Sequence, residues 1–192
     1  MSVAFSNPSQ KDRGAGAGQG ALSMYAPAKI NLSLRVLARR SDGYHEIESL
    51  FCPIGLYDRL TLSPSESIEI RCDAPHVPED PSNLAHRAAT DFFNTLRKSG
   101  RRHAPGGIHI DLRKQIPVGA GLGGGSSDAA TVLKGLNQIH GHPFNAEQLR
   151  AMALPLGADV PFFIDARPAV ATGIGESLRP FPNLPNYFAI VI

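Results

Sequence analysis

Residues 116–130 have the sequence IPVGAGLGGGSSDAA. This glycine-rich segment restricts the possible folds of the chain more than any other feature. Glycines occupy positions 119, 121, 123, 124 and 125. Glycine has no β-carbon, so such a loop adopts positive φ angles and lets a ligand lie against the backbone. Apolar residues at helical spacing follow over residues 129–139, and Ser126, Ser127 and Asp128 are common helix N-caps. We therefore predict a glycine loop that opens a helix.

A helix N-terminus presents unpaired N–H groups and the positive end of its dipole, and both attract phosphate. Gly119, Gly121 and Gly124 also match the dinucleotide-binding pattern, but residues 137–140 read NQIH where an acidic residue is expected. A Walker-type loop would need a lysine at the position of Ser126. A flexible linker does not normally lead straight into a capped, apolar-periodic helix. The sequence favours a phosphate-binding loop whose cation comes from elsewhere.

The composition narrows the classes of partner. A formal charge of +2 is too small to indicate nucleic acid, and the basic cluster at 97–103 contains no aromatic residue, so we interpret it as a solvated helix end. No stretch reaches the roughly 20 apolar residues of a membrane span, and no apolar signal core is present at the N-terminus. Cys52 and Cys72 lie in apolar or alternating stretches, which favours buried thiols over a disulfide or a metal pair. We expect a cytoplasmic protein without membrane partners and without a metal bound directly by a cluster of side chains.

Alternating and helical patterns divide the chain after a polar, glycine-rich start, for which we predict disorder over residues 1–21. Strands are predicted at 28–36, 47–54, 60–62, 68–72, 108–112, 169–174 and 187–192, with turns at 41–43 and at Pro64. Helices are predicted at 84–96, capped by Ser82 or Asn83 and ended by Gly100, and from 145 or 146 to 154. The last apolar run continues to Ile192, so we expect a piece of a longer protein.

Four residues in these elements have two interpretations each. Lys29 shares the polar face of the first strand with Asn31 and is either an ordinary exposed lysine or a functional one. Tyr44 and His45 follow the turn and serve either packing or recognition. Asp159 is the one carboxylate in the apolar stretch 156–164, and an unpaired buried carboxylate is costly, so it needs a partner. Asp159 is either a turn or N-cap residue before Pro161 or a base beside a cation.

Four segments occur in the order known from one family: APAKINLSL (26–34), SDGYHEIESLF (41–51), PVGAGLGGGSSDAA (117–130) and LGADVPFF (156–163). With them, the chain from about residue 24 resembles the GHMP kinases, and among these the members that phosphorylate a cytidine diphosphate sugar alcohol in the non-mevalonate isoprenoid pathway. The resemblance implies an α+β fold of the ribosomal protein S5 domain 2-like type. It also implies an N-terminal ATP-binding domain at 22–165 and the beginning of a truncated C-terminal domain at 166–192.

The resemblance implies roles for individual residues as well. Lys29 and Asp159 would be catalytic and meet at the acceptor hydroxyl. Asn31 would contact the substrate, Tyr44 would stack on its cytosine and His45 would hydrogen-bond that base. ATP would be held by the loop residues Pro117, Val118, Gly119, Ala120, Gly121, Leu122, Gly123, Gly124, Gly125, Ser126 and Ser127, and Mg²⁺ mainly by phosphate oxygens with help from Ser126 or Ser127.

Two other functions stay open at this point. One is another small-molecule GHMP kinase, acting on homoserine or mevalonate, whose acceptor has no cytosine for the Gly43-Tyr44-His45 turn to recognise. The other is a nucleotide-binding module without catalysis, against which the presence of both Lys29 and Asp159 argues. The implied reaction is transfer of the γ-phosphoryl group of ATP to a substrate hydroxyl.

Overall fold

The computed structural model describes residues 20–100, 106–182 and 184–185. The strands are β1 (Leu22–Arg39), β2 (His45–Ser65), β3 (Ile68–Cys72), β4 (Gly107–Arg113), β5 (Ala169–Gly173) and β6 (Ser177–Pro180). The helices are α1 (Leu84–Lys98), α2 (Gly124–Ile139), α3 (Ala146–Ala153) and α4 (Phe162–Asp165), with a 3₁₀ turn, η1 (Leu154–Leu156), after α3. Most of the segment predicted as disordered and the strand predicted at 187–192 lie outside the described residues.

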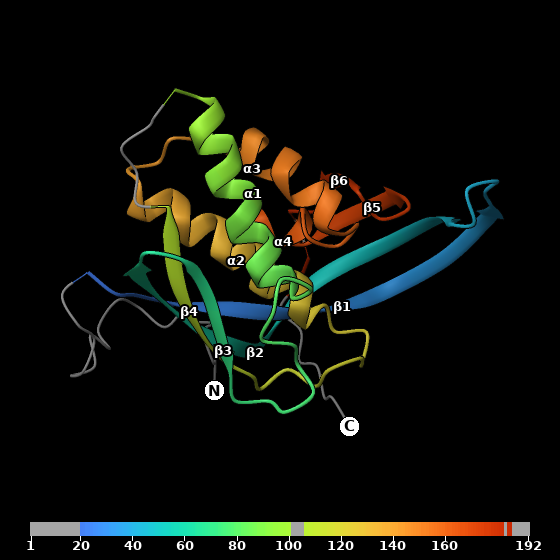
Figure 1. Ribbon diagram of the computed structural model, residues 1–192. Coiled ribbons are helices and arrows are strands. Elements are labelled where there is room, and N and C mark those ends of the chain that lie inside the picture. The colour runs from blue at the N-terminus through green and yellow to red at the C-terminus, as the bar shows by residue number, and fades with distance from the viewer. Residues whose placement is uncertain (1–19, 101–105, 183, 186–192) are drawn as a thin grey trace.

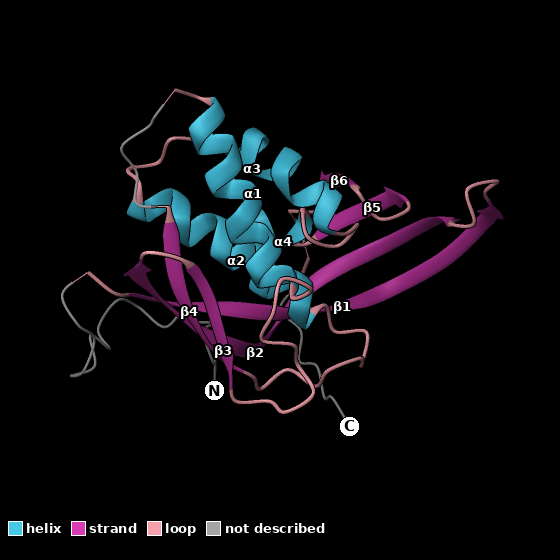
Figure 2. Ribbon diagram, in the orientation of Figure 1, coloured by secondary structure: helices cyan, strands magenta, loops and turns pink. Residues whose placement is uncertain are grey.

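The strands form one mixed sheet in the order β3-β4-β2-β5-β6, and β1 pairs along β2. All pairs are antiparallel except β3 with β4. The helices gather on one face of this sheet (Figures 1 and 2). This two-layer arrangement confirms the predicted α+β class. Because β5 pairs with β2, residues 169–173 continue the same sheet, and the domain boundary predicted at residue 166 stays a prediction.

Local sequence signals account for the helices. Asn83 caps α1 by accepting a hydrogen bond from the Ala85 N–H, and the helix ends before Gly100, which has a φ of +83°. Asn145 caps α3 in a capping box with Gln148. These ends confirm the predicted helices to within about two residues. None of the helices in the described segments is both long and apolar enough to cross a lipid bilayer.

β2 corrects one part of the predicted strand pattern. The runs 47–54 and 60–62 belong to one continuous strand, and Pro64 lies inside it, paired with Ile108. The turn comes instead at residues 66–67. Pro64 is the penultimate residue of β2, where a missing N–H interrupts little of the pairing.

The second half of β1 and the first half of β2 form an arm that extends beyond the helices (Figure 1), and β5 pairs with residues 47–51 of β2 along part of it. The predicted half-buried strand places Leu32, Leu34 and Val36 inward, but they are 45%, 54% and 61% exposed, so this prediction is wrong. Alternation shows which side chains share a face and not whether another layer covers that face. Helices cover the near half of β1, where Ala26 and Ala28 are fully buried, and leave the arm uncovered.

Candidate active site

The glycine loop is anchored to the middle of β1. Gly119, Gly121 and Gly123 have φ angles of +75°, +74° and +72°, as predicted for this loop. Leu122 is buried, and its carbonyl accepts a hydrogen bond of 2.9 Å from the N–H of Lys29. Residues 117–121 are exposed. The loop is thus held at one point beside Lys29 while its backbone stays accessible.

The start of α2 differs from the sequence prediction. The N-cap is Gly123 in the left-handed conformation, without a side-chain hydrogen bond, and the helix begins at Gly124. Ser126, Ser127 and Asp128 lie inside the first turns and cap nothing, so that prediction is wrong. Gly124 and Gly125 can adopt helical angles, and the helix extends back through them. As a result most of the free N–H groups at the start of the helix belong to glycines, with Ser126 beside them, so few side chains obstruct a ligand there.

Gly123 lies in the most crowded position of the loop. A β-carbon there would come within 2.7 Å of the Phe163 ring and 3.2 Å of Lys29 Cγ. Both the positive φ angle and this close approach require glycine. Gly123 therefore joins the loop, the lysine and α4 in one tightly packed contact.

Lys29 and Asp159 form an ion pair, with 3.2 Å between Lys29 Nζ and Asp159 Oδ2. The same ammonium donates a hydrogen bond of 2.7 Å to Asn31 Oδ1 and lies 4.5 Å from the centroid of the Phe51 ring. The Lys29 side chain is only 6% exposed, so the interpretation of Lys29 as an ordinary exposed lysine on the polar face of the strand is wrong. The loop and the Phe51 ring cover that face.

Asp159 has the partner that its apolar surroundings require. It lies in the turn before α4, whose N-cap is Pro161 without a side-chain hydrogen bond, so the carboxylate does not cap that helix. Its side chain is 32% exposed. Asp159 therefore contacts a buried cation on one side and remains open to solvent or a ligand on the other.

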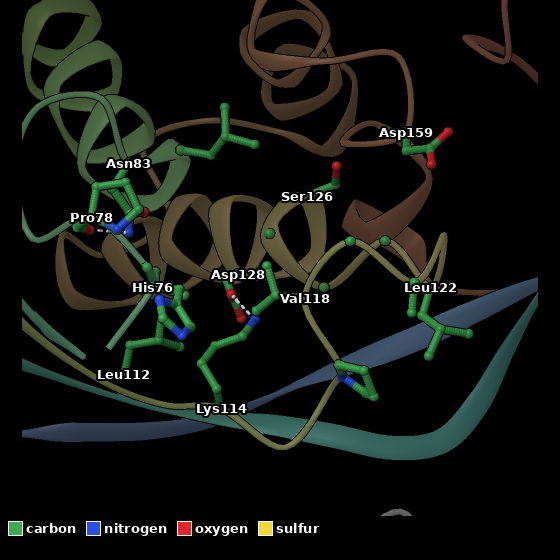
Figure 3. Close-up of a pocket in the computed structure, with 18 of the residues that line it drawn as sticks. His76, Pro78, Asn83, Leu112, Lys114, Val118, Leu122, Ser126, Asp128 and Asp159 are labelled. Carbon is green, nitrogen blue, oxygen red and sulfur yellow. Dashed lines mark hydrogen bonds and ion pairs between the residues drawn. The ribbon is translucent and has the colours of Figure 1, made fainter. Parts of the chain in front are cut away.

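A cavity of about 470 Å³ lies beside the loop. It is bounded by residues 117–126 of the loop and the start of α2, by residues 76–78 and 82–84, and by Lys114, Asp128 and Asp159. In Figure 3, Ser126 and Asp159 lie on one side of the loop, and His76, Pro78 and Asn83 lie on the other. The cavity thus extends from the ion pair past the N-terminus of α2 and has room for a nucleotide.

Two buried charged residues near this cavity, Asp58 and Lys114, were missed by the sequence analysis, and a third, Asp128, was considered only as an N-cap. Lys114 forms ion pairs with Asp58 and Asp128, and all three side chains are at most 7% exposed. Asp58 lies two residues before Leu60 and four before Leu62, which both point inward. Side chains at alternate positions of a strand share a face, so this spacing indicates that the Asp58 carboxylate also points inward. Burial raises the pKa of Asp128 to about 7 despite the opposing effect of Lys114. Burial lowers the pKa of Lys114, but the two carboxylates outweigh it and raise the value above the usual range.

The structure does not bring Tyr44 and His45 next to the ion pair. They lie at the tip of the arm, where His45 pairs with Arg39, whereas Lys29 pairs with Pro53 near the helices. At about 3.3 Å per residue, the strand between Lys29 and Arg39 spans on the order of 30 Å. Tyr44 is 58% exposed, so its ring is available for stacking. Asn31, in contrast, touches Lys29 directly.

Residues 83–167 match the family model described as GHMP kinases N terminal domain. The chain is 47% identical over 174 residues to 4-diphosphocytidyl-2-C-methyl-D-erythritol kinase of Desulfotalea psychrophila, which covers 89% of this chain and 57% of that protein. It is 49% identical over 172 residues to the enzyme of the same name from Syntrophotalea carbinolica, covering 88% of this chain and 59% of that one.

A crystal structure of 4-(cytidine 5′-diphospho)-2C-methyl-D-erythritol kinase superposes with a TM-score of 0.67 at 47% identity, over 83% of this chain and 55% of that one. The chain therefore spans less than two thirds of the length of these relatives. The similarity covers β1, the glycine loop and the turn of Asp159, the segments that form the site. The family model, the relatives and the fold together show that residues 83–167 form a GHMP kinase N-terminal domain and that the chain around them is similar to GHMP kinases.

Proposed function

We propose that the protein transfers the γ-phosphoryl group of ATP to the 2-hydroxyl of 4-(cytidine 5′-diphospho)-2-C-methyl-D-erythritol, a step of the non-mevalonate isoprenoid pathway. The observation that carries the proposal is the Lys29–Asp159 ion pair, which lies against the glycine loop at the end of the cavity. The names of the relatives at 47% and 49% identity support this acceptor over homoserine or mevalonate.

The loop and the start of α2 supply the phosphate site. Residues 117–126 border the cavity, and five of these ten residues are glycines, so few side chains separate the backbone from a ligand. Backbone donors and the dipole of a 16-residue helix favour a polyphosphate there. Phosphoryl transfer needs mainly positioning and charge stabilisation, which this arrangement provides.

Asp159 and Lys29 act on the acceptor. The Asp159 side chain is partly exposed, so a substrate hydroxyl can reach this carboxylate and donate its proton to it. Lys29 is held in place by Asn31 and the Phe51 ring, so its ammonium is preorganised to stabilise negative charge on the oxygens involved in transfer. Such a fixed, buried charge stabilises a transition state more than a solvated lysine does.

The residues around the loop also fit a magnesium ion brought by the nucleotide. Hydroxyl and carboxylate oxygens are the ligands that Mg²⁺ takes, and Ser126 and Asp159 both border the cavity. Ser127 Oγ is buried, and no hydrogen-bond partner for it is found among the described residues. Ser126 would help hold the ion together with phosphate oxygens, and the ion would supply charge neutralisation of the triphosphate.

The arm would recognise the nucleoside part of the acceptor. We propose that Tyr44 stacks on cytosine, His45 hydrogen-bonds it and Asn31 contacts the alcohol beside Lys29. The exposed ring of Tyr44 and the position of Asn31 support these roles. The separation along the arm means that the tip must approach the ion pair when the substrate binds, or that the substrate spans part of that distance.

We further propose that residues 22–165 are the ATP-binding domain, that residues from 166 begin a second domain, and that the protein acts in the cytoplasm on these small molecules alone. Longer relatives support a second domain.

Incubation of the full-length protein with ATP, Mg²⁺ and the cytidine diphosphate alcohol tests the function. NMR of the product should show a new phosphate on the 2-hydroxyl, and equal incubations with homoserine and with mevalonate should give none. Transfer to either of those acceptors at a comparable rate would contradict the proposed substrate, and nucleotide binding without transfer to any acceptor would contradict the enzyme assignment.

A further inference from the structure

The two ends of the glycine loop are joined beneath it by buried charged side chains that the proposed mechanism does not use. Asp58 comes from β2, Lys114 follows β4 just before the loop, and Asp128 is in the second turn of α2. Their side chains are 0%, 7% and 3% exposed. Charged groups of this kind are costly to bury unless each has a partner. The partners of these three groups therefore indicate which segments the cluster holds together.

Asp58 holds the entrance of the loop with both oxygens. Its Oδ1 accepts hydrogen bonds from the N–H groups of Gln115 and Ile116, at 2.6 and 2.8 Å. Its Oδ2 accepts one from Lys114 Nζ at 2.5 Å. Three consecutive residues leading into the loop are therefore fixed to one carboxylate on the central strand of the sheet.

Lys114 carries this connection across to the exit of the loop. Its ammonium also donates to Asp128 Oδ2 at 2.7 Å, as Figure 3 shows. The same nitrogen lies 3.2 Å from the position that a β-carbon of Gly124 would take, so it is directly beside the first turn of α2. One cation thus ties the residues before the loop to the helix after it.

The loop itself has few contacts that could hold its shape. Residues 117–121 are exposed, and Leu122 is the residue that is buried and hydrogen-bonded to β1. A glycine-rich segment loses much conformational entropy on ordering, so fixed ends reduce that cost. Donors that are preorganised before the nucleotide arrives contribute most to binding and transfer.

We propose that Asp58 and Lys114 are positioning residues, which hold the two ends of the loop so that its N–H groups are aligned on the triphosphate. This inference rests on the proposed function and adds residues outside the family's loop motif. Asp128 completes the connection as the acceptor on α2. The competing interpretation is that the three residues only stabilise the fold.

The variant that separates these interpretations is Lys114→Met combined with Asp128→Asn. Lys114→Met alone leaves two buried carboxylates without their cation and risks unfolding. The second change removes one of these charges, while Asp58 keeps its two backbone donors. The matched control is Asn137→Ala, which breaks the buried hydrogen bonds to Phe144 at the other end of α2, about 13 Å along the helix.

Two measurements apply to the parent, the double variant and the control. Hydrogen exchange reports on the amides of Gln115, Ile116 and Ser127, which are bonded at the two ends of the loop. Calorimetric titration reports the dissociation constants for ATP with Mg²⁺ and for the cytidine diphosphate alcohol. We expect these amides to exchange at least about tenfold faster in the double variant than in the control, and the dissociation constant for ATP to be at least about tenfold higher. The dissociation constant for the alcohol should stay within about twofold of the control's value.

Equal exchange and equal ATP affinity in the double variant and in a control of equal stability would overturn the positioning role. The other possible failure is a parent protein that binds no ATP, although its loop-end amides are protected and lose that protection only in the double variant. This result would contradict the proposed function but would support the connection between the loop ends. The two failures are therefore distinguishable.

Discussion

Lys29 Nζ lies 3.2 Å from Asp159 Oδ2, which joins the middle of β1 to the turn before α4 directly beside the glycine loop. The lysine is buried and the carboxylate is partly exposed, so the pair is asymmetric. A buried ammonium with fixed contacts supports a partly exposed carboxylate that a substrate can reach. Phosphoryl transfer by this protein, as proposed, depends on this asymmetric pair.

Replacement of the buried cation should reduce turnover without unfolding the protein. Lys29→Met keeps most of the stem's volume, and Asp159 can be hydrated after the cation is lost. The backbone N–H of Lys29 still bonds to Leu122, so the loop anchor remains. We expect turnover to fall by about 10²-fold or more, the range for loss of one preorganised charge-stabilising group.

Lys134→Met is the matched control for that change, because Lys134 is a partly buried lysine on α2 that donates to the Phe163 carbonyl at 2.9 Å. It should leave turnover per folded molecule nearly intact. A large shift in the urea midpoint of the Lys29→Met variant with normal residual activity would show that Lys29 is structural.

A β-carbon in the loop should impair nucleotide binding selectively. Gly123→Val introduces a branched side chain at a φ of +72° and within contact of the Phe163 ring. ATP affinity should fall more than affinity for the cytidine diphosphate alcohol. Gly141→Val is the control, since Gly141 has the same φ of +72° but open space around it, outside the loop.

Calorimetric titrations of both ligands with both variants separate the effects. Equal losses for ATP and the alcohol in the Gly123→Val variant, or the same ATP loss in the Gly141→Val variant, would indicate general destabilisation rather than a phosphate site.

The stability of the fold should depend on the charge of Asp128. Burial raises its pKa from 3.8 to about 7, so the native state binds a proton more tightly than the unfolded chain. The stability associated with that proton is complete below about pH 4 and is lost as the pH rises through about 7, at roughly 1.4 kcal/mol per unit of pKa difference.

Urea unfolding between pH 5 and pH 8 measures this effect. The difference in the free energy of unfolding between the parent and the Asp128→Asn variant isolates Asp128, because the contributions of the other titrating groups cancel. The parent should lose stability relative to the variant as the pH rises. A difference that is constant, or that changes in the opposite direction, would contradict the raised pKa.

Local patterns were sufficient for much of the fold. The periodicity of α1 and the caps Asn83 and Asn145 act within a few residues, so the sequence predicts those helices closely. The covered and uncovered halves of β1 could not be predicted, because the covering helices come from distant parts of the chain. The same holds for the contact between Lys114, Asp58 and Asp128, whose members meet only through the sheet topology.

The candidate site was predictable in its loop and less so in its geometry. Glycines with positive φ follow from the composition of residues 119–123, but the start of α2 does not, because glycine carries no capping side chain to mark it. The pattern left Lys29 and Asp159 with two interpretations each. Only the resemblance to a family paired them, and the structure brings them into contact.

Recognition of cytosine should depend on the tip of the arm. The double change Tyr44→Ala with His45→Ala should raise KM for the cytidine diphosphate alcohol at least about tenfold and leave KM for ATP nearly unchanged, because base stacking contributes about 1–3 kcal/mol and a lost buried hydrogen bond about 1–3 kcal/mol. Tyr25→Ala, at another exposed tyrosine, is the control and should change neither value. Steady-state kinetics with both substrates measure these KM values. An unchanged KM for the alcohol would show that the arm does not recognise the substrate.

The most direct test of the account is turnover by the Asp159→Asn variant of the full-length protein. The amide keeps the shape of the carboxylate and cannot accept the hydroxyl proton, so turnover should fall by about 10²–10⁴-fold. ATP affinity should stay within a few-fold of the parent, because the loop is unchanged. Asp165→Asn, which removes an exposed carboxylate paired with Arg150 on the neighbouring helix, should keep full turnover. Turnover by the Asp159→Asn variant at the parent's rate would contradict the central claim that this carboxylate is the base of a phosphoryl transfer.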